Sequence, residues 1–360
     1  RIIMQNEIRK IKIAVTSDCN LRCDHCFINK NNKIVLKKTD FEKAVNLLFF
    51  SPGDFKKIEF YGGEPLLYFD KIKDWISIIK NTALKYKKKY GIFIASNGTI
   101  ITKEILKCIK KENIFIAVSF SGSEKSHGYN RLFENKHNSY FIVKKNIKRF
   151  LKNSPSNTFC IYCVDPNFVG NMSADFEEII NLGFKTINIE CVCGKSWGEK
   201  KFIEFEKEMD EINKKILNLI NKKTFIYHEK MYELFSKTHN EQTICPFYQD
   251  LELYPDGNFG FYPFSFVNYE KEKKKIIIGD SRRGFNKKYL NCGYDRKECE
   301  KCLKKYYYKK NLVDGSIALK IRDKKIADFC KFLIKTSSKN ENIKNYIKKA
   351  IELNKSMYER

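Results

Sequence analysis

Residues 17–27, SDCNLRCDHCF, decide the fold and carry three cysteines, Cys19, Cys23 and Cys26. Spacings of four and three residues let three thiolates fold back over one iron–sulfur cube. Iron–sulfur clusters normally take four cysteines, so a loop with three leaves one iron open to another ligand. The run follows a strand-like segment at 11–15, which places it at the C-terminal end of a first strand. A zinc site would normally need four ligands in two pairs, and no second pair lies nearby.

Three further stretches combine a strand-like segment with residues suited to a bound ligand. Residues 58–65, IEFYGGEP, read as a short buried strand that breaks into a glycine turn with a carboxylate. Glycine permits close backbone approach to a ligand, and a carboxylate is complementary to an ammonium group. Residues 92–99, IFIASNGT, and residues 116–122, IAVSFSG, are strands followed by small polar residues. Arg131 follows, and its planar guanidinium suits a carboxylate partner.

Together these stretches resemble the signature of the radical S-adenosylmethionine (radical SAM) enzymes, whose CxxxCxxC run holds a [4Fe–4S] cluster. The resemblance implies that Cys19, Cys23 and Cys26 bind this cluster and that S-adenosylmethionine (SAM) binds its open iron. His25 holds the place before the last cysteine where the family usually carries an aromatic residue. The residues implied to bind the cofactor are Gly62, Gly63, Glu64, Pro65, Ser96, Asn97, Ser119, Arg131 and His25.

The resemblance also assigns roles around SAM. The glycine turn and Glu64 would hold the amino group of the methionine part, and Arg131 would pair with its carboxylate. The SNGT run at 96–99 and Ser119 would lie near the ribose. The family's aspartate in this last region is Ser121 here, so that contact lacks its usual residue.

Strand-like and helix-like runs alternate along the first half of the chain. The strand-like runs lie at 9–16, 57–61, 91–96, 115–120, 157–164 and 186–193. The helix-like runs lie around 39–49, 69–88, 103–112, 137–152 and 173–182. This alternation predicts βαβ units and a parallel sheet, hence an α/β fold. Six such strands resemble the family's partial (β/α)6 TIM-like barrel, in which ligands lie at the carboxyl ends of the strands.

We expect three regions along the chain. Residues 1–237 would form the barrel with bridging helices, residues 238–310 an auxiliary iron–sulfur region, and residues 311–360 C-terminal helices. In the middle region YPDG at 254–257 predicts a hairpin between aromatic-rich strands. This region resembles the SPASM extension or its shortened form, twitch. One auxiliary [4Fe–4S] cluster, or a zinc ion as the alternative, would be held by Cys245, Cys292, Cys299 and Cys302.

The middle region departs from the full SPASM pattern, which has seven cysteines and two clusters. Phe264 stands where the family has a cluster ligand, and Tyr308 stands where a further cysteine would follow. Ser265 replaces the aspartate that serves as base in anaerobic sulfatase-maturating enzymes. The four remaining cysteines suffice for one fully ligated cluster. A straightforward sulfatase maturase is therefore not expected.

Four more cysteines lie on or just after the last two strand-like runs. Period-two geometry puts Cys191 and Cys193 on one face of their strand, and Cys160 and Cys163 on opposite faces of theirs. If the Cys191 face points into the barrel, a thiol there could donate a hydrogen atom to a substrate radical. The alternative for each is a small buried hydrophobe, a common fate of free cysteine.

The amino-acid composition indicates the cellular compartment of the protein and the kinds of partner it binds. No apolar run of the 360 residues approaches the roughly 20 residues of a membrane span, and the N-terminus lacks a signal peptide's apolar stretch. Thirteen cysteines, several at short spacings, indicate metal binding in a reducing compartment, so we expect a cytoplasmic protein without membrane contact. The net charge of +26 comes mainly from lysines spread along the whole chain, which argues against a nucleic-acid footprint.

The resemblance implies an enzyme that cleaves SAM reductively to a 5′-deoxyadenosyl radical, which abstracts a hydrogen atom. Its nearest character is that of ribosomal-peptide maturases and sulfatase-maturating enzymes, so we expect a peptide or protein substrate modified by crosslinking, oxidation or epimerisation. The alternatives are a twitch-type dehydrogenase or cyclase of a small molecule and, from charge alone, an RNA-modifying enzyme. Expected partners are an electron donor such as flavodoxin or ferredoxin and a separate leader-binding protein, since no leader-binding domain precedes the barrel.

Overall fold

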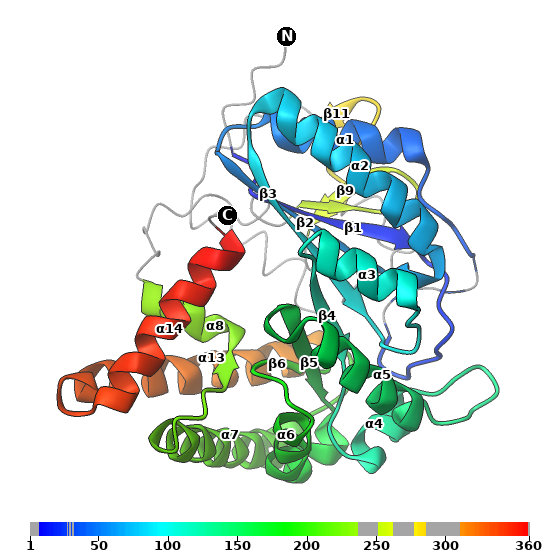
Figure 1. Ribbon diagram of the computed structural model, residues 1–360. Helices are drawn as coiled ribbons and strands as arrows, with labels where there is room; N and C mark the ends of the chain where they lie inside the picture. Colours follow the sequence, from blue (N-terminus) through cyan, green and yellow to red (C-terminus); the bar gives the residue numbers. More distant parts are fainter. Residues whose placement is uncertain are drawn as a thin grey trace.

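The computed structural model describes residues 7–26, 28, 30, 32–236, 251–261, 277–285 and 310–358 (Figure 1). These residues form a sheet of eleven strands in the order β11-β10-β9-β8-β1-β2-β3-β4-β5-β6-β7, with helices packed along it. Within these ranges, no helix combines the length and the apolar content needed to cross a membrane.

Six parallel strands form the main body of the sheet, as the sequence predicts. They are β1 (Lys10–Thr16), β2 (Phe55–Gly62), β3 (Lys89–Ser96), β4 (Phe115–Ser119), β5 (Thr158–Val164) and β6 (Thr186–Cys191). The helices of this part are α1 (Lys38–Phe50), α2 (Phe69–Tyr86), α3 (Lys103–Lys111), α4 (Glu124–Asn130), α5 (Tyr140–Asn153), α6 (Met172–Asn181) and α7 (Gly198–Asn221). The predicted α/β fold with a parallel sheet is confirmed.

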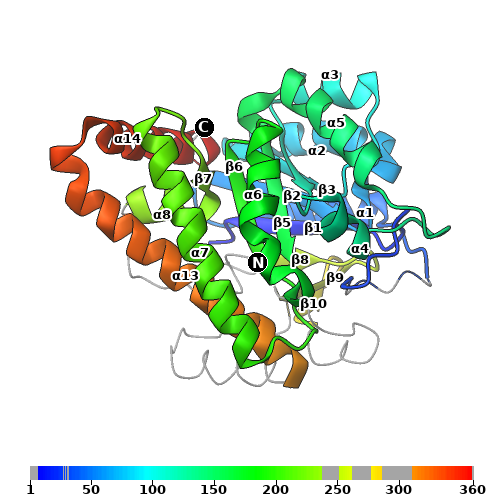
Figure 2. The same cartoon turned by 90° about the horizontal axis from the view of Figure 1, so that it is seen from below.

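Aromatic side chains fasten the first helices to the sheet. Trp75 of α2 stacks on Phe41 of α1 with ring centroids 4.4 Å apart, and both rings lie 6.1 Å from that of Phe60 on β2. All three side chains are buried, and burying an aromatic ring removes a large apolar area from water. At the other end of the sheet, α6 covers β5 (Figure 2), where the Tyr162 hydroxyl donates to Asp175 over 3.1 Å.

The two faces of the parallel strands differ in exposure. Residues that face the helices, such as Ile94, Ile116 and Tyr162, are buried in the core. The alternate residues face the inside of the barrel and are half-buried: Glu59, Tyr61, Ala95, Ala117, Ser119, Ile161, Cys163, Asn188 and Glu190. Because side chains of a strand alternate between its faces, this pattern marks an accessible inner surface.

Short strands extend the sheet at both edges. At the β6 edge, β7 (Tyr227–His228) leads into α8 (Glu229–Ser236). At the β1 edge, β8 (Leu251–Leu253) pairs in parallel with β1, and β9 (Asn258–Phe261) returns antiparallel to it. The hairpin predicted at 254–257 is thus confirmed. Two further short strands follow, β10 (Gly279–Asp280) and β11 (Gly284–Phe285).

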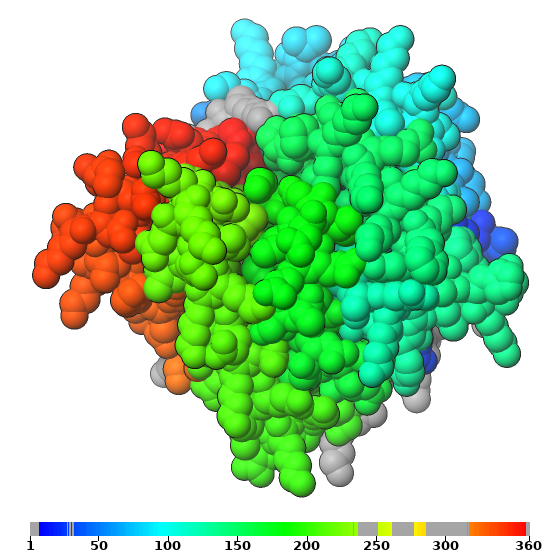
Figure 3. Space-filling view, turned by 60° about the horizontal axis from the view of Figure 1, so that its bottom comes forward, coloured from blue at the N-terminus to red at the C-terminus, as the bar shows by residue number. Residues whose placement is uncertain are grey.

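Two long helices complete the chain, α13 (Lys310–Thr336) and α14 (Glu341–Tyr358). They lie beside α7 and α8 at the β6 end of the sheet, and Figure 3 shows α14 next to the α7 region on one face. Tyr346 of α14 stacks on Tyr227 of β7 with ring centroids 4.4 Å apart. Farther along, the carbonyl oxygen of Met357 approaches Gly91 near the start of β3. The helix therefore passes the N-terminal ends of the strands, opposite the cysteine loop.

Candidate functional site

The three cysteines of residues 17–27 lie in the loop that follows β1. Cys19 is buried, Cys23 and Cys26 are half-buried, and all three are free thiols. The backbone N–H of Cys26 donates to the carbonyl oxygen of Cys23 over 3.1 Å, which closes a turn between them. Burial raises the pKa of Cys23, while the nearby cations of Arg131 and Lys30 lower it and so favour the thiolate.

The three cysteines supply the donor atoms that an iron–sulfur cluster requires. In the described part of the chain, no group of three or more His, Cys, Asp or Glu side chains is arranged to hold one metal ion. In a cube the thiolates bind separate irons, so their sulfur atoms need not converge on one point. Three thiols on one short loop, with cations beside them, therefore suit a [4Fe–4S] cluster with one open iron.

The cysteine loop is anchored to the segment that follows α4. The N–H of Arg22 donates to the carbonyl oxygen of Leu132 over 2.7 Å, and the N–H of Asp24 to that of Asn130 over 3.2 Å. A bridge between Leu21 and Phe133 continues this pairing. Two stretches more than a hundred residues apart thus hold each other in place.

The glycine turn after β2 packs directly on the same loop. The N–H of Gly63 donates to the carbonyl oxygen of Thr16, and the N–H of Glu64 donates to that of Asp18, both over 2.8 Å. A Cβ atom on Gly63 would lie 1.8 Å from the Asp18 oxygen. Gly62 has a φ of +126°, which favours glycine. Both glycines are therefore required by the close approach of two backbones.

Glu64 links the ends of β2 and β3. Its side chain is fully buried; Oε1 accepts from the N–H of Leu66 over 3.0 Å and from the Ser96 hydroxyl over 2.8 Å. Oε2 accepts from the N–H of Asn97 over 2.7 Å. Burial raises the pKa of Glu64 to about 7 even though these donors lower it. Next to it, Pro65 begins the short helix η1 (Pro65–Tyr68).

Asn97 carries this network to the cluster site. Its Nδ2 lies 3.7 Å from Cys19 Sγ and donates to Asn20 Oδ1 over 2.9 Å, while its Oδ1 accepts from the N–H of Thr99. The N–H of Leu21 also donates to Cys19 Sγ, over 3.4 Å. Hydrogen bonds to a ligand sulfur are one of the features that set the potential of a cluster. The structure thus brings the first three sequence stretches together.

Arg131 lies on the other side of the loop. Its side chain is 5% exposed, and its Nε has no hydrogen-bond partner among the described residues. The guanidinium is close enough to Cys23, Cys26 and Cys163 to interact with their charges. A buried cation with an unused donor is a ready partner for a carboxylate.

Two other implied contacts lie at the same end of the sheet. Ser119 is the last residue of β4 and is half-buried on the inner face. His25 lies within the Cys23–Cys26 turn, and burial lowers its pKa to about 3, which leaves the ring neutral. Its Nδ1 has no hydrogen-bond partner among the described residues.

The face of β6 that carries Cys191 does not point into the barrel. Cys191 is 5% exposed and belongs to the apolar core. Cys193 packs beneath α13, where a Cβ on Gly315 would lie 2.5 Å from its sulfur. β6 ends at Cys191 and turns this residue toward the core, whereas Cys193 follows the strand and is half-buried. A role of either thiol as hydrogen-atom donor stays a prediction.

Cys163 of β5 is the thiol on the inner face, a position that sequence reasoning did not distinguish from that of Cys160. It lies opposite Glu190 in the register of β5 and β6; burial raises the pKa of its thiol, and the positive charge of Arg131 lowers it. Alternation alone shows that Cys160 and Cys163 differ in face, not which of them points inward.

The predicted auxiliary residues Cys245, Cys292, Cys299 and Cys302 lie outside the described residues, as do Phe264, Ser265 and Tyr308. The described hairpin of β8 and β9 is attached to the barrel through β1. Its Glu252 accepts a hydrogen bond from the Tyr61 hydroxyl on the inner face of β2.

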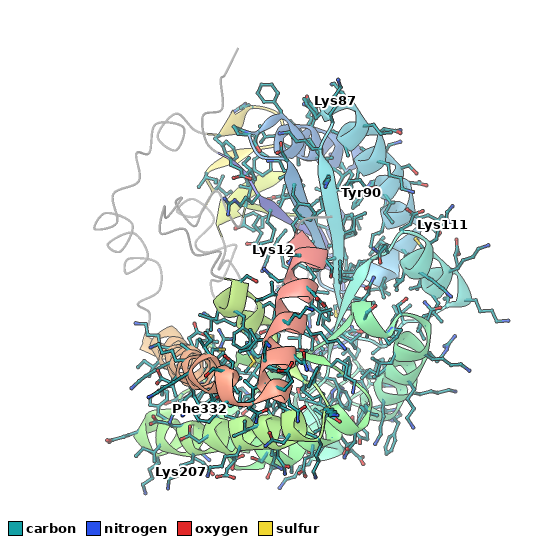
Figure 4. All side chains as sticks on the ribbon, turned by 60° about the vertical axis from the view of Figure 1, so that its left-hand side comes forward. Lys12, Lys87, Tyr90, Lys111, Lys207 and Phe332 are labelled. Carbon is teal, nitrogen blue, oxygen red and sulfur yellow. The ribbon has the colours of Figure 1, made fainter. Side chains whose placement is uncertain are left out.

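Lysines are dispersed over the surface. Lys87, Lys111 and Lys207 project from separate elements (Figure 4), at the end of α2, the end of α3 and the middle of α7. A nucleic-acid site normally gathers its cations on one face or stripe. These three lysines lie on separate elements, and the interpretation of the charge as a compositional bias stays a prediction.

Comparison with known proteins agrees with this site. Residues 13–183 match the sequence model of the Radical SAM superfamily. The radical SAM cyclopropyl synthase TigE of Paramaledivibacter caminithermalis is 27% identical over 146 residues, which cover 36% of this chain and 30% of that protein. The cysteine-type anaerobic sulfatase-maturating enzyme of Clostridium novyi is 32% identical over 144 residues, 37% of each protein. The match thus spans about a third of the length of these relatives.

A solved structure shares the fold over a longer stretch. Native anSMEcpe with bound AdoMet and Kp18Cys peptide aligns with a TM-score of 0.66, covering 81% of this chain and 82% of that one, at 16% identity. At this identity the likeness concerns the fold. The sequence match, the parallel α/β sheet and the three-cysteine loop agree, and this chain carries a radical SAM domain over residues 13–183.

Proposed function

We propose that this protein is a radical SAM enzyme that modifies a peptide or protein. One observation carries the proposal: a continuous hydrogen-bonded network joins Cys19 through Asn97 to Glu64 and the glycine turn. An ordinary metal loop needs no such connection to the ends of two neighbouring strands. This network fixes the cysteine loop to the carboxyl ends of β2 and β3, the end of the sheet where α/β folds place their ligands.

When bound, a reduced [4Fe–4S] cluster and SAM supply a 5′-deoxyadenosyl radical that abstracts a hydrogen atom. Cys19, Cys23 and Cys26 would hold the cluster. Arg131 would pair with the SAM carboxylate, since its guanidinium is buried beside Cys23 and Cys26 with an unused Nε donor.

The rest of the SAM site would be formed by backbone and small side chains. The turn at Gly62 and Gly63 would hold the amino group, because its backbone lies on residues 16–18 just before Cys19. Glu64 would hold this turn in place and would not itself bind the amino group of SAM, because its two oxygens already accept three hydrogen bonds within the protein. Ser119 would lie near the ribose from the inner face of β4.

A peptide or protein substrate is supported by two observations. The inner face of β3 to β6 is partly accessible and carries small side chains such as Ala95 and Ala117. A solved protein with the same fold holds AdoMet together with a peptide. The reaction on the substrate would be a crosslink, an oxidation or an epimerisation.

The proposal includes a second cluster and partners. Cys245, Cys292, Cys299 and Cys302 would bind one auxiliary [4Fe–4S] cluster. The described hairpins of this region are fastened to the barrel by Glu252, which accepts from Tyr61, and by Asp40 of α1, which accepts from the Ser281 hydroxyl between β10 and β11. A flavodoxin or ferredoxin would deliver the electron, and a separate protein would bind a leader peptide.

The direct test is SAM cleavage by anaerobically reconstituted protein with dithionite, measured as 5′-deoxyadenosine by liquid chromatography. We expect wild-type protein and the control Cys108→Ala to form it, because Cys108 is a half-buried residue of α3 far from the loop. Cys23→Ala should form none above background. Formation by Cys23→Ala at the wild-type rate would contradict the proposed site.

The substrate class needs its own readout. With peptides added, mass spectrometry should show a mass change that depends on SAM and on Cys23. A change on small molecules alone, with peptides left unmodified, would refute the peptide assignment and leave the SAM site standing.

A further inference from the structure

Lys195 joins three segments that are distant in sequence. It lies in the loop between β6 and α7, and its Nζ is 2.6 Å from Asp24 Oδ2 and 2.7 Å from Asp165 Oδ2. Asn130 Oδ1 is 3.3 Å away, and the ring of Tyr129 lies 5.4 Å from the same nitrogen. One cation therefore connects the cysteine loop, the end of β5, the end of α4 and its own loop.

Asp24 is the residue through which this cation reaches the cluster site. It stands between Cys23 and Cys26, and its N–H already donates to the carbonyl oxygen of Asn130. Lys195 therefore binds the side chain of Asp24, while the carbonyl oxygen of Asn130 at the end of α4 holds the backbone of the same residue. The side chain of Asp24 is 63% exposed, so the ion pair lies at the rim.

Asp165 makes Lys195 hard to replace. Its carboxylate is 2% exposed and accepts from the N–H of Asn167 at the start of η3 (Pro166–Asn171) and from Lys195. Removing one partner of a buried ion pair leaves an uncompensated charge and is strongly destabilising. Loss of Lys195 would leave two carboxylates close to the cysteine loop without their shared cation.

We propose that Lys195 is a positioning residue for the cysteine loop, which couples the β6–α7 loop at the rim of the barrel to the geometry and charge of the proposed cluster. It acts through Asp24 and touches neither the cysteines nor the reacting atoms in this structure. The effect of Lys195 on a bound cluster rests on the proposed function, because it requires that the three cysteines hold a cluster. The contacts of Lys195 with Asp24 and Asp165, which we call the Lys195 latch, are present in the chain without cofactor.

Hydrogen–deuterium exchange of the cofactor-free protein tests the latch. In Lys195→Met we expect the amides of Asp24 and Cys26 to exchange at least about tenfold faster, because local opening no longer breaks the ion pair. Lys195→Arg should restore most of the protection. The matched control Lys201→Met removes a half-exposed i,i+3 pair with Glu204 on α7 and should leave these amides unchanged. Unchanged exchange in Lys195→Met would overturn the proposal.

A second variant covers the case in which Lys195→Met unfolds as a whole. Asp24→Asn removes only the rim contact and keeps the buried pair with Asp165. It should speed exchange in the Cys23–Cys26 turn while the amide of Asn167 stays protected. If the amides of the Cys23–Cys26 turn exchanged at the same rate in Asp24→Asn as in the wild type, the proposal would also be overturned.

The reduction potential supplies the readout in the loaded protein. Two uncompensated carboxylates make it harder to add an electron, so Lys195→Met should have a lower midpoint potential than wild type, with Lys195→Arg close to wild type. Equal potentials in wild type and Lys195→Met would contradict the coupling. If wild type bound no cluster, the proposed function would fail, while the exchange experiment would still decide the latch.

Discussion

At the scale of single residues, Glu64 shows how burial and hydrogen bonding compete. Three donors favour its charged form, yet complete burial outweighs them and raises its pKa to about 7. The folded protein therefore retains a proton between the ordinary pKa of 4.5 and about 7 that the unfolded chain has already released.

This difference predicts a pH dependence of stability. Because the folded state binds more protons in this window, the free energy of unfolding should fall as the pH rises from 4.5 to about 7 and then level off. Relative to Glu64→Gln, which cannot titrate, the wild type should lose roughly 3 kcal/mol across the window. Urea unfolding of the cofactor-free protein at several pH values measures this. A difference between the two proteins that does not vary with pH would contradict it.

Gly63 supports a prediction about backbone contact. Gly63→Ala places a Cβ against the Asp18 carbonyl oxygen, so the turn must move away from the cysteine loop. We expect a loss of about 1–3 kcal/mol in stability, as for other overpacked sites. SAM affinity measured by calorimetry should fall more than tenfold. The control is Gly198→Ala, where no atom lies within 4 Å of the new Cβ but the φ of +65° is strained for alanine. It should lose stability and keep its SAM affinity; an equal loss of SAM affinity in both variants would refute the role of Gly63.

At the scale of elements, Asp40 fastens the second hairpin to the first helix. This residue of α1 is 3% exposed and accepts from the Ser281 hydroxyl over 2.7 Å, with Arg282 Nε at 3.6 Å. Gly257 in the β8–β9 turn lies against the same carboxylate. One buried acid thus positions both hairpins of the region in which the auxiliary cysteines occur.

Removal of this acid should loosen the hairpins and leave the barrel intact. Asp40→Ala leaves the Ser281 hydroxyl without its partner, and such a loss costs about 1–3 kcal/mol. Hydrogen exchange should therefore quicken across β10 and β11 and remain unchanged in β3. The control Glu42→Ala removes an exposed i,i+4 pair on the same helix and should change neither. Unchanged exchange at β10 in Asp40→Ala would show that Asp40 does not hold the region.

The sequence predicts the strands, the hairpin and the ligand-binding end of the sheet because each depends on local periodicity or turn residues. It does not reveal the latch at Lys195, because Asp24, Asp165 and Lys195 meet only when the loops that follow β1, β5 and β6 come together at the carboxyl ends of the strands. The sequence does not predict which way the side chains of Cys191 and Cys163 point, for a related reason. Alternation separates two faces of a strand, but helix packing decides which of them is buried.

At the scale of the whole molecule, one sheet carries both the radical SAM domain and the attachment of the auxiliary region. β1 pairs with β2 on one side and with β8 on the other, so the cysteine loop and the hairpin extend from neighbouring strands. This arrangement predicts that the proposed clusters load independently, since each has its own ligands.

Loss of the auxiliary site should therefore spare the first cluster. In Cys302→Ala we expect about four fewer irons per chain, with SAM binding retained and substrate turnover impaired. Cys330→Ala is the control, because this thiol of α13 is buried in the apolar core. Wild-type iron content and turnover in Cys302→Ala would refute the auxiliary cluster.

The most direct test of the central claim is the iron and sulfide content after anaerobic reconstitution, with wild type beside the variant in which Cys19, Cys23 and Cys26 are all alanine. The account predicts about eight irons per chain in the wild type and about four in the variant. Iron content that does not fall in the variant would show that these three cysteines do not hold a cluster.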